Sequence, residues 1–452
     1  MTTVAAWFLA PVLLLAMLAL HPSGQPSYLM GDFRAFYCAG AAIAHGANPY
    51  LEEPLRSCER IAGPPAEPAF LQEVALPAPL PPPALLPFVP LSMLPFPIAA
   101  AIYALALVAA MTLAVAILVP ILGVSSVVLN LVFAPITATV TYFVGQPVPI
   151  ALLALALAAR DVRRRRWPFV GIWLGIATIE PHVALPALLG VAIAIQAARI
   201  AVVSAIGVLA ATSIAAVGLP VTTAYVLAVL PAHALANAYE WQFSLTSVLT
   251  SLGANASVAI HLGETMFVAM MAAGIAIAWR VRRMTADDAV MVLVPPAFAV
   301  CGGVHVHFQQ LVVAFPAILY AMVRFPRIRL AAASGLALVM IPWNVMGTTL
   351  LAGAIPVLVG SFCAATTGRR TGVVLSAFSG CVVISIFLLI YLGLGPVEHA
   401  FVAHHYAPEG LAETSWADFS RAALGRPSIL MQWLRVPTLT GLVCGLVAIV
   451  RT

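Results

Sequence analysis

Asp32 is the residue of this sequence whose position most clearly indicates chemistry. It follows the first hydrophobic span directly, in residues 31–37, and a second short block of polar and aromatic residues follows at 45–50. A carboxylate within hydrogen-bond reach of a hydroxyl can remove its proton, and an ionisable residue at a membrane boundary marks a substrate path. The sequence therefore predicts acid–base chemistry at Asp32.

A purely structural role for Asp32 is the alternative. Phe33, Phe36, Tyr37 and Ile43 recur at near-helical spacing, which predicts a short interfacial helix with Asp32 at or near its N-cap. A carboxylate at that end of a helix is favoured by the helix dipole, and its pKa is held low. Residues 46–50 fit a helix stop and turn, because Gly and Asn accept left-handed angles and Pro blocks helix continuation.

Further polar residues recur at predicted external ends of hydrophobic spans. They are Gln146, Glu180, His182, Gln242, His305 and His307. Together with Arg34 they predict the rim of a single outward-facing pocket, with groups for acid–base work and for holding an anion. His305 and His307 are two residues apart and would not share a helix face, so they form a poor metal pair and no metal site is predicted.

The composition defines the class of protein that must position these residues. Of the 452 residues, 63% are hydrophobic and 8% are charged, and the mean hydropathy is +1.05. Runs such as 96–120, 121–143 and 371–395 are apolar on all sides, which excludes the alternating pattern of barrel strands. We therefore expect an all-α integral membrane protein, a single polytopic domain over 1–452 with about 12–14 crossings of roughly 20 residues each.

The basic residues predict the orientation of these crossings. All 21 are Arg, and they cluster at 160–166, 199, 280–283, 324–329, 369–370 and 451. By the positive-inside rule these clusters are cytoplasmic, and the run 163–166 is a topology anchor, so no nucleic-acid partner is expected. The far side then holds residues 21–95, 221–257 and 396–432. Residues 2–20 are predicted to be a retained first helix, because no basic segment precedes them.

The first extracytoplasmic loop, 21–95, is too long to be a simple connector. Its proline-dense end, including Pro81, Pro82 and Pro83, cannot form an ordinary helix interior. Extended or broken backbone at membrane depth is tolerated where it lines a cavity, so a cavity at the outer leaflet is expected here. Cys38 and Cys58 share this loop, and the sequence leaves a disulfide and two free thiols equally open.

The C-terminal extracytoplasmic loop, 396–432, carries less information. We interpret it as a solvated loop whose amphipathic pieces, including Trp416 and Phe419, lie on the membrane surface. No chemistry is assigned to it.

Several of these segments, in order along the chain, resemble glycosyltransferase family 87. They are residues 31–33 with Tyr37, 46–50, 82–83 with 90–91, 145–146, 180–181, 242–245 and 305–307. The family has the GT-C fold and includes enzymes similar to polyprenol-phosphate-mannose-dependent α-mannosyltransferases of bacterial envelopes. The resemblance implies that Asp32 is the catalytic base. It also implies that Arg34 and the polar residues of these segments are substrate contacts, namely Tyr37, Asn48, Tyr50, Gln146, Glu180, His182, Gln242, His305 and His307.

Two positions depart from the family pattern. The family usually carries Lys where this chain has Glu180, and an aromatic residue where it has Pro81. If the lysine of the family holds the donor phosphate, another residue must do so here, or the donor differs.

The function that the resemblance implies is transfer of a hexose, with mannose as the expected sugar, from a polyprenyl-phosphate sugar to a glycolipid or glycan acceptor, with inversion. The expected location is the plasma membrane, with the active site on the extracytoplasmic face. Lipid phosphate is a good leaving group, so no cofactor is required, although a divalent cation near the phosphate stays open. A multi-pass transporter or flippase is the rival interpretation, and a non-catalytic scaffold is a third; the sequence shows no matching halves of the kind that transporters have.

Overall fold

The structure is a computed structural model that describes residues 3–19, 29–62, 74–341, 349–389, 391, 409–423 and 429–452. Within these ranges every regular element is a helix, and a single bridge between extended residues pairs Leu51 with Leu411. The expected all-α class is therefore confirmed. Parts of the two predicted loops, namely 20–28, 63–73, 392–408 and 424–428, lie outside the described residues.

The N-terminal part of the chain forms short helices rather than an irregular loop. They are α1 (Thr3–Trp7), α2 (Leu9–Ala19), α3 (Gly31–Ala44), α4 (Glu52–Ala62), α6 (Pro82–Leu85) and α7 (Phe88–Ser92). A disulfide between Cys38 and Cys58 joins α3 to α4, with the two Cα atoms 5.6 Å apart. The pairing that the sequence left open is thus formed.

The proline-rich segment is held against α3 by a close backbone contact. A Cβ atom on Gly40 of α3 would lie 2.6 Å from the carbonyl of Phe88 in α7, so only glycine permits this approach. Pro82 occupies the first turn of α6, where its missing N–H costs nothing. The segment therefore folds as two short proline-started helices, which is the broken form of the extended or broken backbone that we expected.

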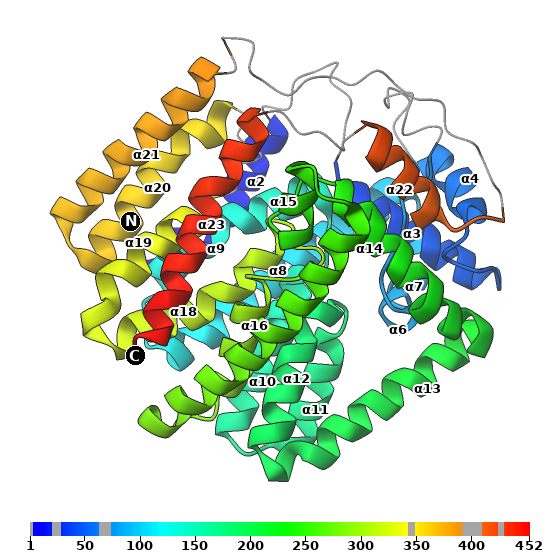
Figure 1. Cartoon of the computed structure of the whole chain (residues 1–452), viewed down its shortest axis with the longest axis horizontal. Coiled ribbons are helices and arrows are strands. Elements are labelled where there is room, and N and C mark those ends of the chain that lie inside the picture. Colours follow the sequence, from blue (N-terminus) through cyan, green and yellow to red (C-terminus); the bar gives the residue numbers. More distant parts are fainter. Residues whose placement is uncertain are drawn as a thin grey trace.

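The middle of the chain supplies most of the core. Its elements are α8 (Phe96–Leu122), α9 (Ser126–Thr139), η1 (Val140–Val144, a π-helix), α10 (Val148–Arg163), α11 (Trp167–Ala177), α12 (Pro181–Ala194), η2 (Gln196–Ala198), α13 (Arg199–Ala224), η3 (Tyr225–Val229), α14 (Leu230–Tyr239), α15 (Leu245–Ser251), α16 (Ala256–Thr285) and α17 (Val290–Ala299). α10 packs on α8 and α11, and α17 packs on α12 and α16. Figure 1 shows α13 running along one side of the molecule, from the lower end toward α7.

The C-terminal elements follow on the other side. They are η4 (Gln310–Ala314), α18 (Phe315–Arg324), η5 (Pro326–Ile328), α19 (Arg329–Val339), α20 (Thr349–Thr367), α21 (Arg369–Leu389), α22 (Ala412–Ala423) and α23 (Ile429–Val450). α20 pairs with α21 and α19 with α23, whereas α22 lies apart from them, beside α14 and α4 (Figure 1). The chain therefore returns to its N-terminal helices before its last helix.

Apolar helices long enough to cross a membrane are the main feature of the bundle. Among the described residues there are six, or seven if the bent pair Gln310–Arg324 and Pro326–Val339 counts as one span. Five shorter apolar helices of 10–17 residues accompany them. Exposed apolar side chains such as Ile200 (81% exposed) and Leu105 (71%) are what a lipid-facing surface requires. The protein is a polytopic membrane protein, and the count of 12–14 crossings stays a prediction.

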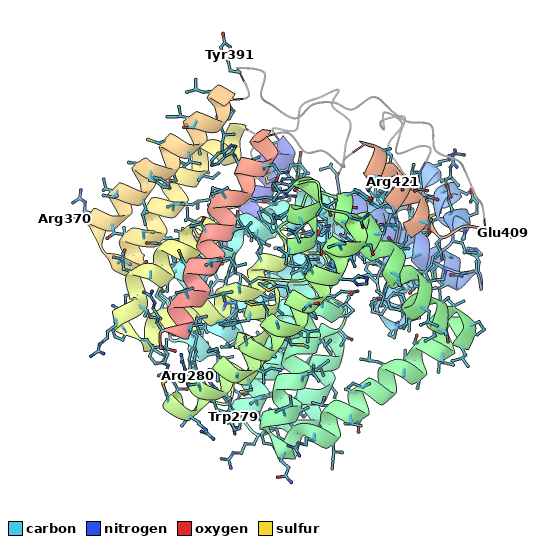
Figure 2. The ribbon with its side chains drawn as sticks, in the orientation of Figure 1. Trp279, Arg280, Arg370, Tyr391, Glu409 and Arg421 are labelled. Atoms are coloured by element: carbon cyan, nitrogen blue, oxygen red, sulfur yellow. A yellow bond between two sulfur atoms is a disulfide. The ribbon has the colours of Figure 1, made fainter. Side chains whose placement is uncertain are left out.

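Arginine residues gather where several long helices end. Arg163 at the end of α10 donates hydrogen bonds to Asp287 and to the carbonyl of Ile121, and Arg282 near the end of α16 pairs with Asp288 at 2.5 Å. In Figure 2, Arg280 lies at the lower left and Arg421 at the upper right of the molecule. This arginine end is therefore remote from α3, α4 and α22.

Candidate active site

Asp32 lies in the first turn of α3 and is held by the loop before α10. The side-chain amide of Gln146 donates a hydrogen bond to Oδ2 of Asp32. The preceding Gly145 has a φ of +73°, and a Cβ atom there would lie 2.8 Å from Cβ of Phe33. Glycine at this position therefore allows the loop before α10 to contact α3, and this contact places Gln146 beside the carboxylate of Asp32.

The N-cap of α3 is Met30, not Asp32. Met30 has left-handed backbone angles (φ 53°), and its N–H donates to the carbonyl of Tyr142 at 3.2 Å. Asp32 is therefore free of a capping role. Burial raises its pKa to about 7, the hydrogen bond from Gln146 lowers it, and the nearby charge of Glu240 raises it. The expectation of a low pKa was wrong, because loss of water around the carboxylate outweighs the helix dipole.

Glu180 stands beside Asp32 at the start of α12. It is 3% exposed, receives a hydrogen bond from Gln310, and lies 3.8 Å from Nε2 of His182 through its Oε2 atom. Its other carboxyl oxygen has no hydrogen-bond partner among the described residues. Burial raises the pKa of Glu180 to about 8, and the neighbouring charge of Asp32 adds to this rise. Glu180 thus carries a proton for much of the time at neutral pH.

Four imidazoles form a group beside these two carboxyls. The ring of His305 lies 4.4 Å from that of His182 and 5.1 Å from that of His233, between ring centroids. His307 lies 3.7 Å from Oε2 of Glu240 through Nε2. Burial holds the pKa of His305 well below its usual range and lowers that of His307 to about 3, so both rings are neutral. They can serve as hydrogen-bond partners for a substrate, not as cations for a phosphate.

Two glutamines position the segment that carries His305 and His307. Oε1 of Gln242 accepts from the N–H of Val306 at 2.9 Å, and Oε1 of Gln310 accepts from the N–H of His307 at 2.5 Å. Gln242 is fully buried, and its amide donates to Asn237 and, at 3.4 Å, to Glu240. Gln242 therefore holds the histidine segment in place; whether it also touches substrate stays a prediction.

The polar groups of the 31–50 region stabilise its own fold. The hydroxyl of Tyr37 donates to the carbonyl of Leu94, and that of Tyr50 donates to the carbonyl of Leu80, each at 2.8 Å. Oδ1 of Asn48 accepts from the N–H of Tyr50 at 3.1 Å. Arg34 is buried in α3, 5% exposed. These contacts tie the region to the proline-rich helices, and the substrate roles predicted for the four residues stay predictions.

A wide apolar groove opens next to the carboxyls. Its volume is about 1480 Å³, and it runs between the proline-rich helices, α8, α11 and α13, with Pro81, Pro82 and Pro87 along one wall. The cavity expected beside the proline segment is therefore confirmed. Tyr103 lines this groove, as do Ile179 and Pro181 on either side of Glu180. The hydroxyl of Tyr103 is buried without a hydrogen-bond partner among the described residues, and its ring stacks on Phe33 at 4.6 Å.

Within the described ranges, no group of three or more His, Cys, Asp or Glu side chains is arranged to hold a metal ion. Dependence on a divalent cation remains untested, because a cation could arrive with a phosphate-bearing substrate.

Sequence reasoning missed several residues of this site. They are Tyr103, His233, Gln310, Glu413 and Trp416. His233 lies in residues 221–257, which the sequence places on the extracytoplasmic side, so its polarity was a usable signal. Tyr103 lies inside an apolar span, and Glu413 and Trp416 lie in a segment with no chemistry assigned. The indole N–H of Trp416 donates to Glu240, and the expected place of its segment on the membrane surface stays a prediction.

Comparison with known proteins gives one match. The sequence model of glycosyltransferase family 87 matches residues 80–300, a range that includes Tyr103, Gln146, Glu180 and Gln242 but not Asp32 or α22. No curated protein and no solved structure matches the chain.

Proposed function

We propose, on the premise that this chain is a membrane glycosyltransferase of family 87, that it transfers mannose from a polyprenyl-phosphate donor to a glycolipid or envelope glycan. Transfer takes place at the extracytoplasmic face of the plasma membrane and inverts the anomeric centre. Asp32 is the base in this proposal.

The observation that carries the proposal is the meeting of the apolar groove with the buried carboxyls. A lipid-linked donor needs an apolar channel for its tail and polar groups at the end of that channel for its phosphate. Tyr103 belongs to both parts, since it lines the groove and its hydroxyl lies near Glu180 and Asp32. Unpartnered polar atoms that are buried are costly, so a ligand that satisfies them gains binding energy.

Asp32 is suited to remove the proton of the acceptor hydroxyl. In the proposed step the acceptor oxygen bonds to the anomeric carbon, while the bond from that carbon to the phosphate oxygen breaks. The phosphate leaves with the electron pair, and the hydroxyl proton passes to Asp32. A base placed in this way contributes roughly 10²–10⁴ to the rate, and a base with a pKa near 7 is matched to neutral pH.

The leaving phosphate is stabilised by neutral donors in this proposal. The Tyr103 hydroxyl lines the groove, and Glu180 and His182 flank Pro181, which also lines it. The hydroxyl oxygen of Tyr103, Nε2 of His182 and Oε1 of Glu180 have no hydrogen-bond partner among the described residues. Donors placed where charge develops stabilise the transition state. Glu180, in place of the usual lysine, would then act as a hydrogen-bond donor in its protonated form.

The disulfide and the arginines support the extracytoplasmic placement. A disulfide persists in an oxidising compartment, and the Cys38–Cys58 bond lies in the region that carries Asp32. Arginine residues lie at the ends of α10 and α16, at the end of the bundle opposite to Asp32. By the positive-inside rule they favour a cytoplasmic location for that end.

The test is transfer of labelled mannose from polyprenyl-phosphate mannose to endogenous glycolipid in membranes that contain the wild type or Asp32→Asn. We expect the variant to lose at least about 10²-fold in rate. Asp418→Asn is the matched control, since it also removes one carboxylate but on an exposed surface. Equal transfer by wild type and Asp32→Asn would remove Asp32 from the mechanism, and no transfer by the wild type would exclude this donor.

A further inference from the structure

α22 brings two side chains from the C-terminal region to the polar site. Glu413 and Trp416 are three residues apart and therefore share a face of the helix. Oε2 of Glu413 lies 3.1 Å from Nδ1 of His233, and the indole N–H of Trp416 donates to Oε1 of Glu240. Glu413 is 1% exposed. One face of α22 thus contacts two ionisable side chains, His233 in α14 and Glu240 in the loop that follows α14.

Main-chain bonds fix α22 against the start of α4. The N–H of Ala412 donates to the carbonyl of Tyr50 at 3.0 Å, and the N–H of Glu52 donates to the carbonyl of Gly410 at 2.8 Å. The hydroxyl of Ser415 adds a bond of 2.7 Å to the fully buried carboxylate of Glu52. These contacts define the position of α22 independently of the site residues, so the helix can orient what it touches.

The two groups that α22 contacts are also the ones whose charges act on Asp32. Glu240 raises the pKa of Asp32 and His233 lowers it, after the larger effects of burial and of Gln146. Glu240 is further held by His307 at 3.7 Å, so its two oxygens face different partners. A buried charged side chain is stabilised by its hydrogen-bond and ion-pair partners. Removal of one partner therefore changes the protonation state or the position of that side chain.

We propose that α22 is a positioning element of the active site, in which Glu413 orients His233 and Trp416 orients Glu240 beside Asp32. This inference rests on the proposed function, because it takes Asp32 as the base. The residues named act through other groups, and neither needs to touch the substrate. Glu413 and Trp416 lie outside residues 80–300, which match the family, whereas His233 and Glu240 lie within them.

The charges around these groups determine the sign of the expected effect. The groups that face His233 are Glu413, Glu240, Asp32, His182, His305 and His307. Those that face Asp32 are Gln146, Glu180, Glu240, His233 and Tyr103. Removal of the Glu413 carboxylate lets the imidazole of His233 lose its positive charge more easily. Without that positive charge nearby, the ionised form of Asp32 is less stable, and the pKa of Asp32 rises above about 7.

The experiment compares the pH profile of mannose transfer in the wild type, Glu413→Gln and Asp418→Asn. We expect Glu413→Gln to shift its acidic limb upward by about 0.5 pH unit, which lowers the rate about twofold at pH 7, and to approach the wild-type rate by pH 8. Asp418→Asn, on the exposed side of the same helix, should follow the wild type. A wild-type profile for Glu413→Gln, or an equal loss at every pH, would overturn the proposal, since a merely structural role lowers the rate without moving the profile.

Trp416→Phe provides a second test that keeps an aromatic ring at this position. It removes the N–H donor to Glu240 together with part of the indole ring, and we expect a loss of about fivefold or more in kcat with the KM for the donor unchanged. An unchanged kcat would contradict the positioning role of Trp416. Asp32→Asn separates the two proposals: if it retains transfer, the proposed function fails, whereas an inactive Asp32→Asn with an unaffected Glu413→Gln refutes only the role of α22.

Discussion

Gln146 donates a hydrogen bond to Asp32 across 114 residues of sequence. The bond joins α3, which lies outside the family match, to the loop before α10, which lies within it. The partly buried carboxylate of Asp32 thereby receives a fixed orientation. In the proposed mechanism this orientation directs the carboxylate toward the acceptor hydroxyl.

The rate of transfer should depend on pH through both buried carboxyls. Burial raises the pKa of Asp32 to about 7 and that of Glu180 to about 8. Asp32 must be deprotonated to accept a proton, so below pH 7 the rate should fall by about tenfold per unit. Glu180 must be protonated to donate to the phosphate, so the rate should fall again above pH 8. Measurement of kcat/KM between pH 5.5 and 9.5 should give a bell-shaped profile, whose two limbs belong to the coupled pair.

Glu180→Gln tests whether Glu180 causes the alkaline limb of the pH profile. The amide keeps a hydrogen-bond donor that does not titrate in this range, so the alkaline limb should disappear while the acidic limb remains. Persistence of the alkaline limb in this variant would show that another group causes it.

Gly145→Ala should disturb Asp32 through a steric contact. The new Cβ would lie 2.8 Å from Cβ of Phe33, and the φ of +73° adds about 1–2 kcal/mol of backbone strain. We expect at least a tenfold loss of transfer and a lower thermal unfolding temperature. Gly46→Ala is the matched control, because Gly46 has a φ of +70° but no atom within 4 Å of its added Cβ. If both variants lose activity equally, backbone strain and not the contact with Phe33 is responsible.

A bulky residue in the apolar groove should weaken donor binding. Ser204 on α13 lines the groove, whereas the adjacent Val203 is exposed and does not. Ser204→Trp should therefore raise the KM for polyprenyl-phosphate mannose by about tenfold with little change in kcat, and Val203→Trp should leave both constants unchanged. Steady-state kinetics with purified protein in lipid nanodiscs measures this difference. A donor that binds elsewhere would leave the KM of both variants at the wild-type value.

Cysteine labelling should reveal which side of the membrane each end of the bundle faces. Arg421 and Arg370 are both exposed and lie at separate places on the surface (Figure 2). In a background of Cys381→Ser and Cys444→Ser, we expect an impermeant maleimide to label Arg421→Cys in intact cells. Arg370→Cys should be labelled only after permeabilisation. The reverse pattern would place the active site in the cytoplasm.

Much of the fold could be predicted from the sequence because the bilayer leaves few options for an apolar chain. The helical class follows from composition. The cavity beside Pro81–Pro83 follows because proline cannot form an ordinary helix interior, and broken backbone at membrane depth is tolerated where it lines a cavity. The number of crossings could not be derived with the same certainty. Hydrophobic runs in this chain include helices such as α11 and α12, which are too short to span alone, and length is the only signal that separates them from full spans.

The site could be predicted in part. Gln146, Glu180, His182 and His305 were grouped with Asp32 from their polarity at span ends, and the structure brings these residues together. The pKa of Asp32 could not be predicted, because burial depends on tertiary packing and dominates the local effect of the helix. Glu413 and Trp416 were missed for the same reason, since only the folded chain brings α22 to α14.

The contact of α22 with α4 also has a consequence for the synthesis of the protein. Ser415 bonds to Glu52, which precedes it by 363 residues, and at 5–20 residues per second a ribosome needs roughly 20–70 s to cover that distance. During this interval Glu52 and Glu240 lack the hydrogen bonds that Ser415 and Trp416 of α22 later donate to them. If α22 positions the active site as proposed, this site is among the last parts of the protein to be completed, and a chain that ends before α22 has no transferase activity.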